Sequence, residues 1–206
     1  MGIGPNKIFR RIENTSVLSK TVEPFLSIKE MEKIIIVIPE KDRTRAVEVL
    51  EERYHPKKIE FTEGGERRQD SVFRGLMHLS QYKPRYVLIH DAARPWVSAN
   101  IIRNVLAALT EHKACVPVVP APDAMKSVNG TGYITSHHKR TTTMAAQTPQ
   151  GFVFQEILKA HSLAAGDGIP YIDDTEVFNA YIGSVFTISG DPANRKITFP
   201  HDLPSA

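Results

Sequence analysis

Short apolar runs that alternate with amphipathic segments constrain the fold of this chain more than any other feature of its sequence. The run Ile34–Ile38 is rich in β-branched residues and stops at Pro39, which is typical of a strand buried on both faces. Further strands are expected within 57–65, 85–92, 114–122 and 184–190, and helices within 43–54, 66–79, 98–112, 152–165 and 173–183. Strands that alternate with helices predict parallel βαβ units and therefore a doubly wound α/β sheet.

The composition is that of one ordinary globular domain. The 206 residues are 41% hydrophobic and 24% charged, so we expect a single domain spanning 1–206. The longest apolar runs fall far short of the ~20 residues that cross a bilayer, and no signal-peptide-like stretch follows Lys7. The sequence therefore predicts no membrane partner and no secretion. The single cysteine, Cys115, cannot form an internal disulfide and suits a reducing cytoplasm.

Charge and short motifs weigh against several classes of protein. The net charge of +3 fits a protein that handles anions, although the excess is small. No stretch combines dense lysine and arginine with interleaved aromatic residues, so no nucleic-acid partner is predicted. The sequence contains no G-x-S-x-G, G-x-x-x-x-G-K-[ST] or G-x-G-x-x-G, and so lacks the usual signatures of a hydrolase, a P-loop kinase and a NAD dehydrogenase.

Polar and glycine residues follow two of the expected strands, where doubly wound sheets bind their ligands. Asp91 can hold a magnesium ion, which prefers oxygen ligands and substrate phosphates, and Arg94 can grip a phosphate with its forked donors. The same two residues can also simply build a polar turn, and the local spacing does not decide between these interpretations. Gly64 and Gly65 precede a helix whose amino end favours anions, but glycine pairs usually form turns.

Three positions have the character of helix caps. Ser98 can cap the start of the helix within 98–112. Asp173, with Glu176 three residues on, forms the pattern of a capping box. Thr148 before Pro149 also fits an N-cap followed by proline at the first helical position, and taken alone that structural role is favoured.

The stretch 123–147 interrupts the alternation of strands and helices. It predicts a protruding hairpin or arm with Asn129-Gly130 at a tight turn. His137, His138 and Arg140 lie in this arm, but no further ligands with zinc spacing surround them, so the sequence predicts no zinc site there.

Six segments occur in one order along the chain: 6–9 (NKIF), 63–72 (EGGERRQDSV), 87–95 (VLIHDAARP), 123–126 (DAMK), 147–152 (QTPQGF) and 190–203 (GDPANRKITFPHDL). In this order and spacing the sequence resembles, over essentially its whole length, the 2-C-methyl-D-erythritol 4-phosphate cytidylyltransferases of the non-mevalonate isoprenoid pathway. The resemblance implies a Rossmann-like nucleotidyltransferase sheet with a dimerisation β-arm at about 123–147. It also implies functional roles for Asp91, Gly64, Gly65 and Thr148.

The resemblance further implies a reaction. In that family the phosphate of methylerythritol phosphate attacks the α-phosphorus of magnesium-bound CTP, and pyrophosphate leaves, so positive charge is needed where negative charge is crowded. Lys7 would stabilise the reacting α-phosphate, and Lys196 would contact the substrate near it. Asp91 would lie at the metal and the substrate hydroxyls. The base and ribose of the nucleotide would be surrounded by Ala92, Gly64, Gly65 and Ser71.

By the same resemblance the arm reaches across a two-fold homodimer with shared sites. Arg140 and Arg94 would approach the partner's methylerythritol phosphate, and Thr148 would contact it too. Where many members of the family carry Asp-Thr in the arm, this chain has Asp123-Ala124, so one hydroxyl on the substrate side is lost.

A larger departure concerns the two ends. Family members begin with an apolar strand and an Ala-Ala-Gly-x-Gly-x-Arg loop before a Met-Gly-like pair, whereas this sequence starts at Met1-Gly2, and it stops at HDLPSA where relatives continue into a closing helix. We therefore expect a chain truncated at both ends, whose strands at 33–38 and 86–89 face a gap. Two alternatives stay open: a cytidylyltransferase for a polyol phosphate such as ribitol 5-phosphate, and a degenerate, non-catalytic homologue.

Overall fold

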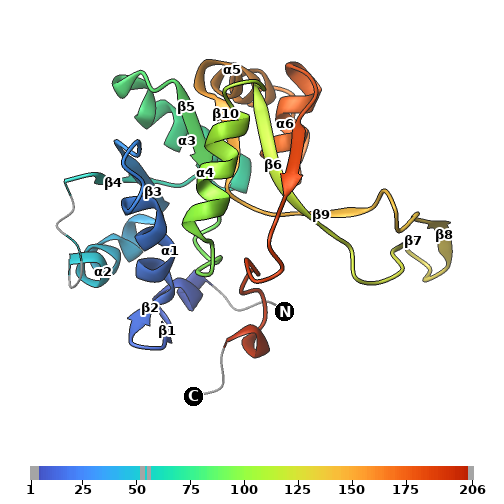
Figure 1. Ribbon diagram of the computed structural model, residues 1–206, viewed down its shortest axis with the longest axis horizontal. Helices are drawn as coiled ribbons and strands as arrows, with labels where there is room; N and C mark the ends of the chain where they lie inside the picture. The colour runs from blue at the N-terminus through green and yellow to red at the C-terminus, as the bar shows by residue number, and fades with distance from the viewer. Residues whose placement is uncertain (1–4, 52–53, 55–56, 204–206) are drawn as a thin grey trace.

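The computed structural model describes residues 5–51, 54 and 57–203, arranged as Figure 1 shows, and the Met1-Gly2 pair lies outside these residues. The elements of the first half are η1 (Pro5–Phe9), β1 (Arg11–Ile12), β2 (Thr15–Ser16), α1 (Val17–Leu26), β3 (Ile34–Ile38), α2 (Glu40–Glu51), β4 (Ile59–Glu63), α3 (Arg68–Leu79), η2 (Ser80–Tyr82) and β5 (Tyr86–Ile89). Those of the second half are α4 (Ala99–Ala108), β6 (Ala114–Pro120), β7 (Lys126–Val128), β8 (Ile134–His137), β9 (Met144–Ala146), β10 (Gln150–Val153), α5 (Phe154–Ala164), α6 (Asp174–Tyr181), β11 (Phe186–Ser189) and η3 (Pro200–Asp202). No helix within the described ranges is long and apolar enough to cross a membrane.

The largest sheet is mixed rather than purely parallel. Its strands lie in the order β11-β6-β10-β5, and β9 also pairs with β6. β11 is parallel to β6, whereas β10 runs antiparallel to both β6 and β5. Gln150 is paired with Ile89, so the start of β10 lies beside the end of β5. This register brings the residues that follow β5 next to those that precede β10.

The predicted start of the helix at 152–165 is wrong. Gln150–Val153 form β10, and α5 begins only after them. Apolar residues continue without a break from the buried strand into the buried face of the helix, so periodicity alone does not separate the two. Gly151 fits a strand that α4 covers closely, because a Cβ at this position would lie 2.4 Å from Cγ1 of Val105. Since a strand follows it, Thr148 is not a helix N-cap.

β3 and β4 form a separate parallel ribbon (Figure 1), paired in register from Ile34 with Ile59 to Ile38 with Glu63. In the part of the chain that the structure describes, no strand pairs with the second edge of β3 or with the second edge of β5. Among the described residues, β3 and β5 thus belong to different sheets.

Alternate residues of the central strands point to opposite faces, and each face is covered by helices. Val87 and Ala114 belong to a core beneath α3, α5 and α6, together with Phe152. Leu88 and Cys115 face the other side, where α1 and α4 cover the sheet. The ribbon has its own apolar core against η1, α1 and α2. The main sheet is thus a three-layer α/β arrangement.

The predicted helix caps at α4 and α6 are confirmed. The Ser98 hydroxyl accepts the N–H of Ile101 at 3.3 Å. The Asp173 carboxylate accepts the N–H of Glu176 at 3.0 Å, and the Glu176 carboxylate accepts the N–H of Ile172 at 2.7 Å. These caps satisfy N–H groups that have no partner inside the helix.

The stretch 123–147 forms the predicted arm, which projects away from the sheets in Figure 1. β7 and β8 pair antiparallel, and β9 returns the chain to β6. The turn spans 129–133 rather than two residues, because the Asn129 side chain accepts the N–H groups of Thr131 and Tyr133. Every residue of β8 is exposed. The arm therefore has no core of its own.

Candidate functional site

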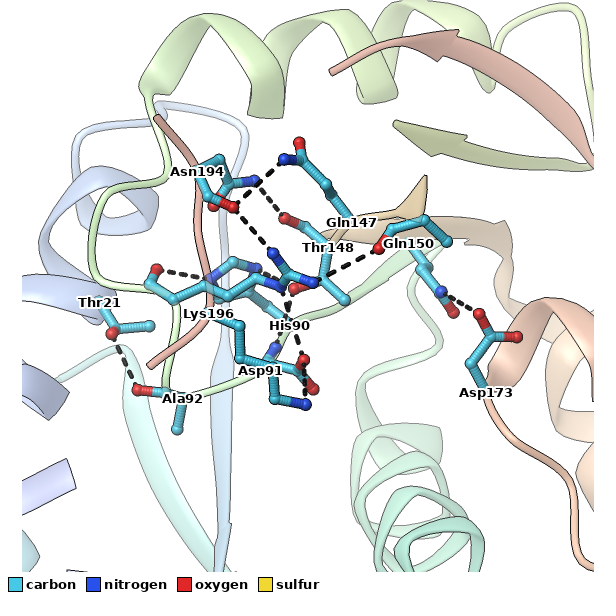
Figure 2. Close-up of polar contacts among 12 residues, drawn as sticks. Thr21, His90, Asp91, Ala92, Gln147, Thr148, Gln150, Asp173, Asn194 and Lys196 are labelled. Carbon is cyan, nitrogen blue, oxygen red and sulfur yellow. Dashed lines mark hydrogen bonds and ion pairs between the residues drawn. The ribbon is translucent and has the colours of Figure 1, made fainter. Parts of the chain in front are cut away.

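An ionic cluster lies directly after β5, at the carboxyl end of the strand (Figure 2). Asp91 Oδ2 is 2.9 Å from Nζ of Lys196 and 3.6 Å from Nε of Arg94. Burial raises the pKa of Asp91, but the nearby charges of Lys196, Arg68 and Arg94 outweigh it and hold that pKa below its ordinary value. A partly buried carboxylate that stays ionised is a group that can meet a cation or a hydroxyl of a ligand.

Lys196 comes from a segment near the carboxyl end of the described chain. The N–H of Ile197 donates to the Ala93 carbonyl at 2.8 Å, and the Arg195 guanidinium lies 4.5 Å from the centre of the Trp96 ring. Ile197 is fully buried. These contacts on both sides of Lys196 direct its amine toward the end of β5 (Figure 2).

Lys7 lies on η1 within electrostatic range of the same cluster. Its pKa is lowered by burial and by the charge of Lys196, while Asp91 and Asp202 act in the opposite direction. Lys7 and Lys196 repel one another, and together with Arg94 they place positive charge beside Asp91, where an anionic ligand can meet it.

Thr148 and His90 fix the backbone of the cluster. The N–H of Asp91 donates to Oγ1 of Thr148 at 3.1 Å, and the same hydroxyl lies 2.9 Å from Nδ1 of His90. Nε2 of His90 lies 3.2 Å from the carbonyl of Arg94. Burial lowers the pKa of His90 to about 4, so the ring is neutral, with Nε2 donating to the carbonyl and Nδ1 accepting from the hydroxyl. The hydroxyl of Thr148 therefore donates its proton to His90 and accepts the N–H of Asp91.

A second set of bonds ties the segment of Lys196 to the start of β10. Nη1 of Arg94 donates to the Asn194 carbonyl at 2.8 Å, and Nδ2 of Asn194 donates to the Thr148 carbonyl at 2.8 Å. Nε2 of Gln147 donates to the Asp191 carbonyl at 2.8 Å. Asn194 is fully buried. Sequence reasoning assigned no role to Gln147, Asn194 or His90, although all three lie inside segments that carry the family resemblance.

The glycine pair and Ser71 meet at the start of α3. The N–H of Gly65 donates to Oγ of Ser71 at 3.0 Å, and the Gly64 carbonyl accepts from Nη1 of Arg74 at 2.8 Å. A Cβ on Gly65 would lie 2.4 Å from Cβ of Asp70, so the loop can pack this tightly on the helix only with glycine there. The predicted nucleotide residues Gly64, Gly65 and Ser71 are therefore together.

Ala92 and Arg140 lie elsewhere. The Ala92 carbonyl follows Asp91 and accepts from Oγ1 of Thr21 at 3.0 Å (Figure 2). Arg140 is exposed on the arm, where Nη2 donates to the Pro122 carbonyl at 2.5 Å. Among the described residues, no hydrogen bond or ion pair joins Arg140 to Asp91, Lys196 or Arg94. The predicted site residues thus form the cluster after β5 and the group at the start of α3, and Arg140 belongs to neither in a single chain.

Comparison with known proteins agrees with this geometry. The family model described as "IspD: 2-C-methyl-D-erythritol 4-phosphate cytidylyltransferase" matches residues 1–206. The chain belongs to this family. The 2-C-methyl-D-erythritol 4-phosphate cytidylyltransferase of Bacillus cereus is 34% identical over 203 residues, which are 98% of this chain and 88% of that relative. The bifunctional IspD/IspF enzyme of Bartonella henselae is 34% identical over 201 residues, 97% of this chain and 50% of that protein.

Solved structures of the same family share the fold. The 2-C-methyl-D-erythritol 4-phosphate cytidylyltransferase from Thermus thermophilus superposes with a TM-score of 0.79 at 31% identity, covering 98% of this chain and 91% of that one. The 4-diphosphocytidyl-2C-methyl-D-erythritol synthase from Anaerococcus prevotii superposes with a TM-score of 0.85 at 26% identity, covering 93% of this chain and 84% of that one. The resemblance predicted from the six segments is confirmed.

Proposed function

We propose that the protein transfers the cytidylyl group of CTP to 2-C-methyl-D-erythritol 4-phosphate and releases pyrophosphate. The observation that carries this proposal is the cluster of Lys196, Asp91 and Arg94 at the end of β5, in a chain that matches the cytidylyltransferase family from end to end. Relatives that cover nearly the whole chain carry the name of this activity.

The chemistry requires positive charge at the reaction centre. An oxygen of the methylerythritol phosphate forms a bond to the α-phosphorus of CTP, while the bond from that phosphorus to the departing pyrophosphate breaks, so negative charge is crowded on both sides. Lys7 stabilises the α-phosphate and Lys196 contacts the substrate beside it. Fixed cations in a partly buried site stabilise such a transition state more than cations in water do.

Asp91 is the residue that would hold magnesium. Among the described residues, no group of three or more His, Cys, Asp or Glu side chains could hold a metal ion. One carboxylate together with phosphate oxygens and water suits Mg²⁺, which keeps much of its hydration and is often held by substrate phosphates. Bound there, the ion would neutralise charge on the pyrophosphate that leaves. Asp91 also lies where it can accept a hydroxyl of the substrate.

The nucleotide would lie between the start of α3 and the end of β5. Backbone groups of Gly64 and Gly65, with Ser71 and Ala92, surround its base and ribose. The close packing of Gly65 on α3 supports this proposal, because it places the glycine loop and the Ser71 hydroxyl, which accepts the N–H of Gly65, at one point.

The arm would complete the site across a homodimer in the cytoplasm. The exposed apolar side chains of Val128, Tyr133 and Ile134 support an interface on the arm, since Tyr133 is 74% exposed and nothing in the described part of one chain covers it. In the dimer Arg140, with Arg94 and Thr148, would approach the partner's methylerythritol phosphate. The position of Arg140 away from its own cluster supports this sharing.

The test is pyrophosphate release with CTP and magnesium, measured in parallel with methylerythritol phosphate and with ribitol 5-phosphate. We expect turnover with methylerythritol phosphate to be the faster. Faster turnover of ribitol 5-phosphate would contradict the proposed substrate. No release with either would favour the non-catalytic homologue.

A further inference from the structure

A buried ionic cluster outside the site joins the starts of α3 and α6 to α5. Asp174 is fully buried, and both of its carboxylate oxygens are paired. Oδ2 lies 2.6 Å from Nη2 of Arg68, and Oδ1 lies 3.1 Å from Nε2 of His161. His161 is 2% exposed. Three helices thus meet at one carboxylate.

The cluster calls for an explanation other than stability. Removing two charges from water costs several kcal/mol per ion, and apolar residues of similar volume often serve a core equally well. The bond from Nη2 of Arg68 to a carboxylate that His161 holds on its other side gives something different, namely a defined position for the residue that carries the guanidinium.

Arg68 is the first residue of α3, between the glycine loop and Ser71. Its side chain is 37% exposed, so one part is held by Asp174 while another part is open. The charge of Arg68 is also among those that lower the pKa of Asp91. Arg68 is therefore paired with the buried carboxylate of α6 and lies close enough to Asp91 to act on its pKa.

Two glutamines strengthen the same connection. Nε2 of Gln150, on β10, donates to Asp173 Oδ2 at 2.8 Å, and Asp173 caps α6 (Figure 2). Nε2 of Gln69 donates to the Ile169 carbonyl at 3.1 Å, on the loop before α6. The start of α6 is thus tied both to the strand that begins beside Asp91 and to the first turn of α3.

We propose that Asp174 and His161 hold Arg68 as a positioning residue, which sets the start of α3, with Gly65 and Ser71, at the separation from Asp91 that the nucleotide requires. This inference rests on the proposed function and deepens it. According to this inference, Asp174 affects the affinity for CTP but not the affinity for the second substrate, although Asp174 contacts neither of them.

Arg67 offers a matched control for Arg68. It is the preceding residue, it also carries a guanidinium, and its ion pair is with Asp70 on the surface at 2.7 Å. Arg67→Gln and Arg68→Gln therefore remove the same group from adjacent positions, and only the second removes the connection to α6.

The experiment measures amide hydrogen exchange over residues 64–72 and the dissociation constant of CTP with magnesium by calorimetry. We expect Arg68→Gln and Asp174→Asn each to raise exchange in this segment and to weaken CTP binding about tenfold, because a small displacement of binding groups has effects of this order. Arg67→Gln should change both by less than about twofold. Since the two residues act through one contact, the double variant should be no worse than Arg68→Gln alone.

The KM values separate positioning from a general loss of structure. We expect the KM for CTP to rise while the KM for methylerythritol phosphate stays within about twofold. An equal rise for both substrates, or equal effects of Arg67→Gln and Arg68→Gln on exchange, would overturn the inference. If Arg68→Gln does not fold, Arg68→Lys replaces it, since lysine keeps the charge but lacks the planar guanidinium. We expect Arg68→Lys to have an intermediate effect on hydrogen exchange and CTP binding. An effect no larger than that of Arg67→Gln would overturn the inference. If the unchanged protein binds no CTP, the proposed function fails, and the exchange data still decide whether Arg68 holds α3.

Discussion

The β3-β4 ribbon and the main sheet support two different parts of the proposed site. The ribbon leads through β4 into the glycine loop and Ser71, whereas the main sheet presents Asp91 at the end of β5 and Thr148 before β10. In the described chain β10 has a paired strand on each side, but β3 has a partner on one side only. β5, which presents Asp91 at its end, pairs with β10 and so belongs to a five-stranded sheet, while the predicted nucleotide loop depends on a two-stranded ribbon.

A matched pair of core substitutions tests this contrast in stability. Ile157 on α5 is fully buried in the core of the main sheet, and Ile38 on β3 is 3% exposed in the core of the ribbon. Isoleucine-to-alanine changes in a core cost about 2–5 kcal/mol of unfolding free energy, depending on how far the surroundings can collapse. We expect Ile157→Ala to lie near the upper end and Ile38→Ala near the lower end in urea denaturation. Equal losses would show that the ribbon is supported as well as the sheet.

The next largest effect concerns catalysis at the end of β5, in the main sheet. Lys196→Ala removes the cation 2.9 Å from Asp91, and loss of one such stabilising group costs about 10²-fold in kcat. Lys113→Ala is the control, since that exposed lysine pairs with Glu156 and not with Asp91. Pyrophosphate release measures both variants. Unchanged turnover in Lys196→Ala would remove this lysine from the proposed reaction centre.

These contrasts also explain how much of the site the sequence reveals. Asp91 and Arg94 stand out locally, because a carboxylate and an arginine directly after a buried strand lie where α/β sheets bind ligands. Lys7, Lys196 and Arg140 carry no local pattern, and only the family resemblance predicts their roles. The structure brings Lys196 to Asp91, yet a role for Arg140 stays a prediction because it depends on a second chain.

The remaining features depend on contacts between distant segments. Asn194 holds the Thr148 carbonyl across 46 residues, and Asp174 holds Arg68 across 106 residues, so neither contact leaves a periodic signal in the sequence. The sequence does not reveal β10, because its apolar residues run directly into those of α5. Periodicity predicts the other long strands and most helices, but the packing of the sheet decides which polar side chains meet.

A smaller loss is expected when the bond between the two strand ends is removed. Thr148→Val keeps the shape of the side chain but leaves the Asp91 N–H and Nδ1 of His90 without their partner. An unpaired buried polar group costs about 1–3 kcal/mol, so we expect kcat to fall about tenfold as Asp91 shifts. Thr148→Ser restores the hydroxyl and should recover activity to within about twofold of the unchanged protein. If serine does not rescue the loss, the methyl group rather than the hydrogen bonds explains the effect.

The smallest expected effect, a difference in amide hydrogen exchange, measures the unpaired edge of β3 most directly. The N–H of Ile34 donates to the Lys58 carbonyl at 2.8 Å, toward β4. Successive residues of a strand direct their N–H groups to opposite sides, so the N–H of Ile36 also points toward β4 and that of Val37 points away from it. We expect the amide of Val37 to exchange at least about tenfold faster than that of Ile36, because no strand in the described chain protects it. Gly151 and Phe152, which have paired strands on both sides, serve as the control, and both should exchange slowly. Slow exchange at Val37 would mean that another segment covers the open edge of β3 in solution, and the ribbon would then be as well supported as the main sheet.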